Sequence, residues 1–375
     1  MRIGIDMRMA GEGFGIGRYI TELVLELLRK KNHEYVLFFD EHFSKPAYKN
    51  FSQIHPNCRL VSAKYYSLEE QVFFPAILKN NRLDLIHFPN FNVPIFCPAP
   101  YIVTIHDLIH HHFPGRKKRN VLHRLAYRAI IRSAVRSAAK IIAVSQVTKN
   151  DIIKLLGTPP EKISVIYEGV SADYQKGNNP ATDRRTLTKF GILKPYVLAV
   201  GVWRRYKNFP FLASAFADMK KKLRLPHQLV IIGEEDKSYP EIKQETSNRF
   251  PDIIIAPGKV PAFALPALYR SASCFVNPSL SEGFGLTTIE AQACGTPVLA
   301  SDIPVSKEIL GDTALFFDPQ NVQSLTHALQ NVLTQEFFRK ALSEKGYLNS
   351  QNYRWEKAAH ETENLYQQIA STKFK

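Results

Sequence analysis

The most informative stretch of the sequence is Asn277-Pro-Ser-Leu-Ser-Glu-Gly-Phe-Gly-Leu-Thr-Thr-Ile-Glu-Ala-Gln-Ala-Cys-Gly-Thr-Pro297. It predicts a strand that ends at Asn277, a loop that contains glycines, and a helix over about residues 286–294. Gly295 then caps the helix and Pro297 opens another strand. A strand, a short loop and a helix in this order are typical of a parallel α/β sheet.

The loop and the start of this helix carry the first candidate site residues. Backbone amides at a helix N-terminus, together with the helix dipole, favour a bound diphosphate, and here they come from Gly283, Phe284, Gly285 and Leu286. Glu282 before the helix and Glu290 inside it supply carboxylates that can accept hydrogen bonds from sugar or ribose hydroxyls. The alternative is an ordinary turn with two solvated glutamates.

Outward from this stretch, short apolar runs alternate with helical patterns along the whole chain. This alternation predicts parallel sheets that are covered on both faces. In the first half, the predicted strands are 2–6, 35–39, 83–87, 101–105, 140–144 and 163–166. In the second half, they are 196–200, 228–232, 253–255, 274–277, 297–300 and 314–317.

A polar stretch, residues 174–182, separates the two sets of strands and is the best linker candidate. The fold class is therefore α/β, with two doubly wound, Rossmann-like domains facing across a cleft. We expect the domains to cover residues 1–178 and 190–350, and a C-terminal helix over 351–375 to return to the first domain.

Composition narrows the class of protein further. The chain has 375 residues and a formal net charge of +15. No apolar run approaches the ~20 residues that a membrane-spanning helix needs, and Met1 is followed directly by a predicted strand. We therefore expect a cytoplasmic protein that can bind peripherally to the inner face of the membrane. The four cysteines form no CxxC pair, which favours reduced core thiols.

The run from Asn277 to Asp302 resembles family 4 (group 1) of the retaining GT-B glycosyltransferases, in which Glu282 and Glu290 match the EX7E motif. Further matches follow in the order typical of the family and cover essentially the full chain. They are Gly15-Ile-Gly-Arg-Tyr19, Thr104-Ile-His-Asp107, Ala143-Val-Ser145, residues 201–208, Gly311-Asp-Thr-Ala314 and Trp355-Glu-Lys.

The resemblance implies a role for each matched residue. The first domain would bind the acceptor and the second the nucleotide sugar, with Glu290 on the ribose and Glu282 on the donor sugar. Lys207 would hold the diphosphate together with Arg204 or Arg205, which the pattern leaves open because Tyr206 stands where many relatives carry arginine. His106 would face the donor sugar, and Gly15 and Gly17 would lie in a loop that closes over the donor phosphate and the acceptor. The loop around Val260 would read the base, and Lys259 is unusual there.

The resemblance also implies the reaction. A hexose, plausibly mannose, would pass from a GDP- or UDP-sugar to a hydroxyl of a glycan or lipid-linked acceptor in cell-envelope polysaccharide synthesis. It implies no cofactor and no bound metal, and the leaving phosphate would help to deprotonate the acceptor. The alternatives are a small-sugar transferase of the sucrose or trehalose type and a non-catalytic nucleotide-sugar binder. Relatives often carry Asn-Gly where this chain has Glu168-Gly169; Glu168 either alters acceptor recognition or is inert.

The positive charge is concentrated between Leu108 and Asn150, where ten Lys and Arg residues meet no Asp or Glu. Arg124, Arg128, Arg132, Arg136 and Lys140 recur every fourth residue, which predicts one basic helix face. Such a helix, over residues 116–140, can contact an anionic membrane. The alternative is a solvated face on a helix that packs against the sheet. No nucleic-acid module accompanies this charge, so no nucleic-acid partner is expected.

Overall fold

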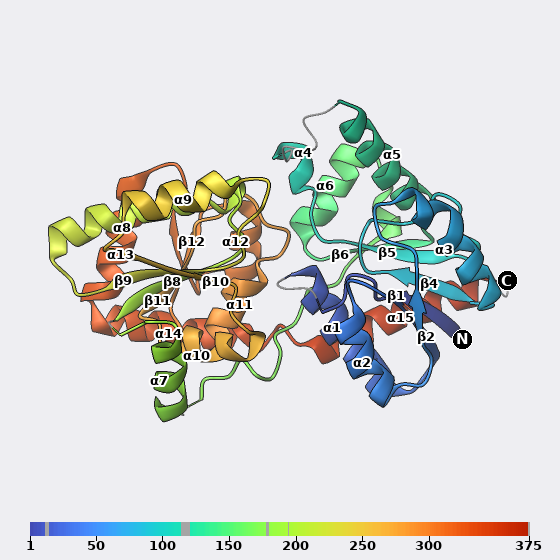
Figure 1. Cartoon of the computed structure of the whole chain (residues 1–375), viewed down its shortest axis with the longest axis horizontal. Coiled ribbons are helices and arrows are strands. Elements are labelled where there is room, and N and C mark those ends of the chain that lie inside the picture. Colours follow the sequence, from blue (N-terminus) through green and yellow to red (C-terminus); the bar gives the residue numbers. More distant parts are fainter. Residues whose placement is uncertain (12–14, 114–120, 178–179, 194, 374–375) are drawn as a thin grey trace. The chain divides into compact units, whose positions relative to one another are not determined.

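The computed structural model describes residues 1–11, 15–113, 121–177, 180–193 and 195–373. It divides into two compact units (Figure 1). Unit 1 consists of Met1–Gly169 and Arg354–Lys375, and unit 2 of Val170–Tyr353. The sequence had suggested boundaries at residues 178 and 350.

Unit 1 is built on a seven-stranded sheet with the order β3-β2-β1-β4-β5-β6-β7, in which every pair of neighbours is parallel. The order reverses between β1 and β4, and open α/β sheets bind their ligands beyond the carboxyl ends of the strands at such a point. The strands are β1 (Arg2–Asp6), β2 (Glu34–Asp40), β3 (Cys58–Val61), β4 (Leu85–Phe88), β5 (Tyr101–Ile105), β6 (Lys140–Ala143) and β7 (Ile163–Val165).

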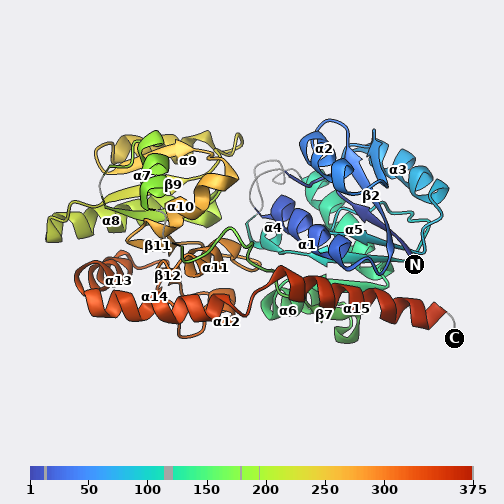
Figure 2. The ribbon, with the colours of Figure 1, turned by 90° about the horizontal axis from the view of Figure 1, so that it is seen from below.

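Helices cover both faces of this sheet. Side chains of α3, α5 and α6 join the core on one face, and α2 packs against the other through Phe51 and Phe39. The C-terminal helix α15 belongs to unit 1, where it lies beside α1 and buries Tyr366 (Figure 2). The helices are α1 (Ile16–Lys30), α2 (Lys45–Ile54), α3 (Leu68–Asn80), α4 (Ile109–His112), α5 (Val121–Ser137), α6 (Gln146–Leu156) and α15 (Trp355–Lys373).

Unit 2 repeats this plan with a six-stranded parallel sheet of order β10-β9-β8-β11-β12-β13. Its order reverses between β8 and β11, so the predicted diphosphate loop follows a strand at this point. The strands are β8 (Tyr196–Val200), β9 (Gln228–Ile232), β10 (Ile254–Gly258), β11 (Cys274–Asn277), β12 (Val298–Ser301) and β13 (Leu315–Phe317).

The helices of unit 2 also lie on both faces of its sheet. Side chains of α8, α9 and α13 contribute to the core on one face of the sheet. On the other face, Tyr269 of α10 packs against Phe275 of β11. The helices are α7 (Pro180–Lys189), α8 (Phe209–Leu223), α9 (Pro240–Arg249), α10 (Leu265–Arg270), α11 (Leu286–Ala293), α12 (Pro304–Leu310), α13 (Val322–Thr334) and α14 (Glu336–Ser350). Two parallel α/β units are the fold class predicted from the sequence, which is confirmed.

Three details differ from the predictions. Strand β3 was missed, because its two central residues are exposed and its apolar signal is short. The polar stretch 174–182 is not the boundary between the units: Tyr174 is buried and α7 begins at Pro180. Helix α5 ends at Ser137, so Lys140 lies in β6, where its ammonium donates to the Glu161 carbonyl.

Two further findings concern membrane spans and cysteines. Within the described ranges, no helix is long and apolar enough to cross a membrane. All four cysteines are unpaired thiols, and three of them are buried.

Candidate active site

Two loops of unit 2 meet at the carboxyl edge of its sheet, one after β8 and one after β11. The Leu280 amide donates to the Tyr206 carbonyl at 2.7 Å, which ties the loops together. The Lys207 ammonium then lies 2.6 Å from Glu282 Oε1, and both side chains are largely shielded, with 14% and 12% of their surfaces exposed. The structure thus joins two predicted site residues that are 75 positions apart.

The N-terminus of α11 follows Glu282 directly. Gly285 precedes the helix with φ +92°, in the left-handed region that favours glycine, and this N-cap residue has no side chain that could accept a hydrogen bond from the first turn. Amides of the first turn of a helix can bind an anion. The predicted residues Gly283, Phe284, Gly285 and Leu286 therefore lie next to the Lys207–Glu282 pair in the chain and share its edge of the sheet.

Glu290 lies one turn into α11 and is only 1% exposed. Its Oε2 accepts a hydrogen bond from the Tyr269 hydroxyl at 3.1 Å. This contact fixes the carboxylate against α10, inside unit 2.

The two candidate arginines have different partners. Arg204 Nε donates to Asp236 Oδ2 at 2.8 Å, whereas the Arg205 guanidinium lies over the Tyr239 ring, 5.5 Å from its centre. Burial raises the pKa of Asp236, but its hydrogen bonds with the Ser238 amide and Arg204 outweigh burial and lower it. The charge of Arg204 is therefore already balanced by a carboxylate.

The loop predicted to read the base follows β10. Val260 is buried, and the neighbouring Lys259 ammonium lies 3.9 Å from Glu234 Oε2 on the surface.

In unit 1, His106 follows β5 and is paired with Glu168. Its Nδ1 lies 3.1 Å from Glu168 Oε1, and its Nε2 lies 2.9 Å from the Pro89 carbonyl oxygen. A carboxylate and a carbonyl both accept hydrogen bonds, so only the protonated ring can satisfy both. Burial lowers the pKa of His106, but the hydrogen bond and charge of Glu168 outweigh burial and raise it. The carboxylate that departs from the family pattern thus holds the imidazolium.

A chain of buried groups continues from this pair. The Tyr19 ring packs edge-on against His106 with ring centres 4.6 Å apart, and its hydroxyl lies 3.2 Å from Thr104 Oγ1. Thr104 Oγ1 in turn lies 2.9 Å from His87 Nε2. Burial, together with the nearby His106, lowers the pKa of His87 to about 3, so this second histidine is neutral.

The glycine loop of unit 1 is described in part, because residues 12–14 lie outside the described ranges. Gly15 is the N-cap of α1 with φ +82°, and a Cβ there would have open space around it. Its conformation, and not crowding, therefore favours glycine. Gly17 is buried in the first turn, where its carbonyl accepts a hydrogen bond from the Thr21 hydroxyl.

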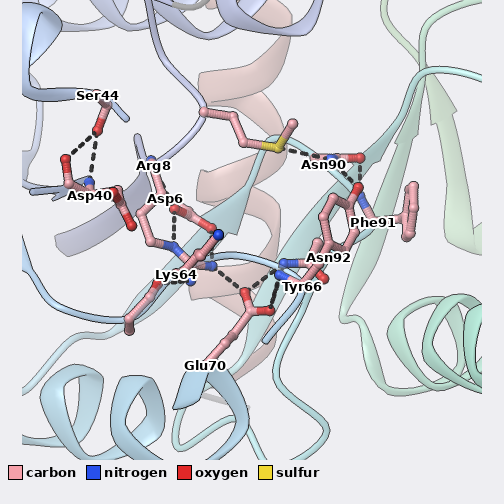
Figure 3. Close-up of polar contacts among 12 residues, drawn as sticks. Asp6, Arg8, Asp40, Ser44, Lys64, Tyr66, Glu70, Asn90, Phe91 and Asn92 are labelled. Atoms are coloured by element: carbon pink, nitrogen blue, oxygen red, sulfur yellow. Dashed lines mark hydrogen bonds and ion pairs between the residues drawn. The ribbon is translucent and has the colours of Figure 1, made fainter. Parts of the chain in front are cut away.

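Sequence reasoning missed a polar cluster after β1 (Figure 3). Arg8 is completely buried, and its guanidinium bonds Asp6 at 2.7 Å and Glu70 at 2.5 Å. The Asn92 amide donates to both oxygens of Glu70. Burial raises the pKa of Glu70 despite Arg8 and Asn92. The available signal was Asp6-Met-Arg8 directly after the first strand.

A cavity of about 10 Å³ adjoins this cluster, enough for one group the size of a water molecule. Its lining includes Pro89, whose carbonyl oxygen lies 2.9 Å from His106 Nε2. The lining residues are Asp6, Met9, Ile20, Tyr65, Pro89, Asn90 and Asn92.

Asp40 and the possible metal ligands are the two remaining features to place. Asp40, the acidic residue at the end of the second strand, accepts hydrogen bonds from the His42 and Phe43 amides and so caps a turn. Figure 3 shows its backbone contacts with the Ser44 hydroxyl. Within the described residues, no three His, Cys, Asp or Glu side chains are grouped to share a metal ion.

Comparisons with known proteins agree with these two units. A model of the group 1 glycosyl transferases matches residues 188–349, and a model of glycosyltransferase family 4 matches residues 15–174. The chain is 27% identical over 371 residues to O-antigen chain mannosyltransferase B of Escherichia coli, which covers 94% of this chain and 95% of that protein.

Among solved structures, sucrose-phosphate synthase from Thermosynechococcus elongatus superposes with a TM-score of 0.78 at 20% identity, covering 99% of both chains. Anabaena HepE in complex with UDP-glucose superposes with the same TM-score at 17% identity, covering 98% of this chain and all of that one. The two family models together span most of the chain. The protein belongs to family 4 (group 1) of the glycosyltransferases, and it is a glycosyltransferase enzyme with the two α/β units of the GT-B fold.

Proposed function

We propose that the protein transfers a hexose, plausibly mannose, from a GDP- or UDP-sugar to a hydroxyl of a glycan or lipid-linked acceptor in cell-envelope polysaccharide synthesis. The observation that carries the proposal is the Lys207–Glu282 pair beside the N-terminus of α11, whose N-cap residue is Gly285. A cation and helix amides stabilise the charge of a departing diphosphate, while the carboxylate accepts hydrogen bonds from sugar hydroxyls. The naming of a full-length relative as an O-antigen mannosyltransferase supports mannose and this kind of acceptor.

In this reaction, the bond between the sugar's anomeric carbon and the β-phosphate oxygen breaks. A bond to the acceptor oxygen forms on the same face, so the configuration is retained. The acceptor proton passes to the departing phosphate, whose charge Lys207, the α11 amides and Arg204 or Arg205 stabilise. In unit 2, Glu290 would bind the ribose and the loop at Val260 would read the base. In unit 1, His106 and the loop with Gly15 and Gly17 would have the roles that the family resemblance implies.

The first test is thermal stabilisation by GDP, UDP and ADP. A ligand at 100 times its dissociation constant stabilises the folded state by about 2.7 kcal/mol, which is readily measured. Stabilisation by GDP or UDP fixes the donor class. No stabilisation by any of the three would count against the proposed donor site.

The second test is turnover of the matching nucleotide sugar with polysaccharide fragments, with sucrose- or trehalose-type small acceptors, and with phosphate. We expect transfer to the polysaccharide fragments, with the anomeric configuration of the product retained by NMR. Glu290→Ala should abolish turnover, whereas Glu245→Ala, which removes an exposed carboxylate of α9, should not. Transfer to the small sugars alone would replace the acceptor in the proposal, and nucleotide binding without any turnover would indicate a binding protein.

A further inference from the structure

Exposed apolar side chains are concentrated on one part of unit 1. Of the thirteen large hydrophobic residues exposed in the described ranges, five come from α3 and the segment 95–96, and we call these the apolar patch. Leu68 and Phe96 are 85% and 81% exposed. The apolar patch consists of Leu68, Val72, Phe73, Ile95 and Phe96.

The two segments form one surface. The Ile95 amide donates to Gln71 Oε1 on α3 at 2.9 Å, which holds residues 95–96 against the helix. The opposite side of α3 buries Phe74 and Leu78 in the core, so this helix is apolar on both sides. A group of exposed apolar residues of this kind marks a binding surface in a soluble protein.

Charge indicates what the surface binds. Unit 1 contains 28 Lys and Arg against 17 Asp and Glu, a formal +11 of the chain's +15. Three arginines of α5, Arg128, Arg132 and Arg136, are exposed. Because unit 1 is strongly basic, a second copy of the chain would be repelled, whereas an anionic surface would be attracted.

Helix α5 supplies charge but little apolar surface. It packs Tyr127, Ile131 and Val135 into the core, so its apolar side cannot also enter a membrane. The segment after β4 links it to the patch: the Phe91 ring lies 5.4 Å from Tyr127 of α5 and 5.9 Å from Tyr66, two residues before α3. The basic face and the apolar patch therefore belong to adjoining elements.

We propose that the apolar patch inserts into the interfacial region of an anionic lipid bilayer while the α5 arginines contact its headgroups. Apolar insertion combined with attraction to anionic lipid is how peripheral proteins bind membranes. The inference is independent of which sugar is transferred, and it rests on the proposed function only in placing the acceptor at the membrane.

The test is co-sedimentation of the full chain with vesicles of phosphatidylglycerol and phosphatidylethanolamine, and with pure phosphatidylcholine vesicles. We expect binding to the anionic vesicles alone at low salt. The double variant Leu68→Ser/Phe96→Ser should lower the partition coefficient at least tenfold. The matched control Phe263→Ser/Phe337→Ser, which removes two equally exposed aromatic residues of unit 2, should change it less than twofold. Equal binding by the patch variant and the wild type, or no binding by the wild type, would overturn the proposal.

A fluorescent reporter tests insertion directly. Both natural tryptophans, Trp203 and Trp355, are buried, so Phe96→Trp adds the one exposed indole. Its emission should shift to the blue on anionic vesicles, whereas that of Phe337→Trp should not. An unshifted spectrum would contradict insertion. Sedimentation velocity tests the alternative occupant: if the wild type is a dimer and the patch variant a monomer, the patch binds a second copy of the chain and the proposal is overturned. These assays contain no donor sugar, so a negative result would not bear on the transferase proposal. Turnover with a water-soluble acceptor tests that proposal separately.

Discussion

The charged groups of unit 2 and those of unit 1 are held in different ways. In unit 2, the Lys207–Glu282 pair lies at the carboxyl edge of the sheet, with 14% and 12% of the two side chains exposed. In unit 1, the side chains of Arg8 and Glu70 are at most 1% exposed, and those of His106 and Glu168 at most 10%. Each of these charges already has a buried partner.

The difference indicates that the two units respond differently to a charged ligand. A partly exposed cation can exchange its carboxylate partner for a phosphate, so the unit 2 site can respond to an anionic ligand. A buried network with balanced charges changes little when a ligand arrives. The comparison predicts that charge substitutions in unit 2 affect the reaction most.

The largest effect is expected from Lys207→Ala. Removing a preorganised group that stabilises charge in the transition state costs about 10² to 10³ in turnover, so kcat/KM for the nucleotide sugar should fall by that factor. Lys340→Ala, which removes an exposed lysine of α14, is the control. A loss below threefold in Lys207→Ala would show that the diphosphate is held elsewhere.

The same comparison explains what the sequence could predict. The unit 2 residues between Asn277 and Gly295 are contiguous, so one strand-loop-helix pattern locates them together. The resemblance added Lys207, and the structure shows its partner to be Glu282.

The unit 1 network could not be predicted in this way. Its members come from β1, the start of α3 and the segment after β4, and only the folded sheet brings them together. Glu168 was noticed as a departure from the family pattern, but its partner His106 lies 62 residues earlier. The place of Arg8 after the first strand was a signal, but its burial could not be predicted from the sequence, because most arginines are exposed.

The second prediction concerns Glu168→Gln. Without the carboxylate charge, burial dominates and the pKa of His106 should fall below its usual 6.5. NMR titration of the imidazole should show this directly, and kcat near pH 6.5 should fall about tenfold if the imidazolium contacts the sugar.

Glu161→Gln is the matched control, because Glu161 is an exposed carboxylate of the same unit. An unchanged pKa of His106 in Glu168→Gln would show that Glu168 does not hold the proton on the ring. A lowered pKa with unchanged kcat would confine the pair to a structural role.

A third, smaller effect distinguishes the two arginines of unit 2. Asp236 already balances Arg204, whereas the Arg205 guanidinium lies over the Tyr239 ring. Arg205→Ala should therefore weaken GDP or UDP binding about fivefold, or roughly 1 kcal/mol, and Arg204→Ala less. Titration calorimetry measures both, and the reverse order would assign the phosphate contact to Arg204.

The last prediction concerns pH and the buried histidines of unit 1. Because the pKa of His87 is about 3 in the folded state, the unfolded chain takes up a proton near pH 6.5 that the folded unit does not. Stability is therefore present above pH 6.5 and is lost as the pH falls toward 3, by up to about 1.4 kcal/mol for each pH unit. His106 has the opposite sign, since its raised pKa gives stability below pH 6.5 that is lost as the pH rises through the folded-state value. Hydrogen exchange of the β4 and β5 amides at pH 7 and pH 5 measures this loss of stability. We expect the loss in the wild type and a smaller loss in His87→Gln. The control His42→Gln, which changes an exposed histidine, should show the same loss as the wild type.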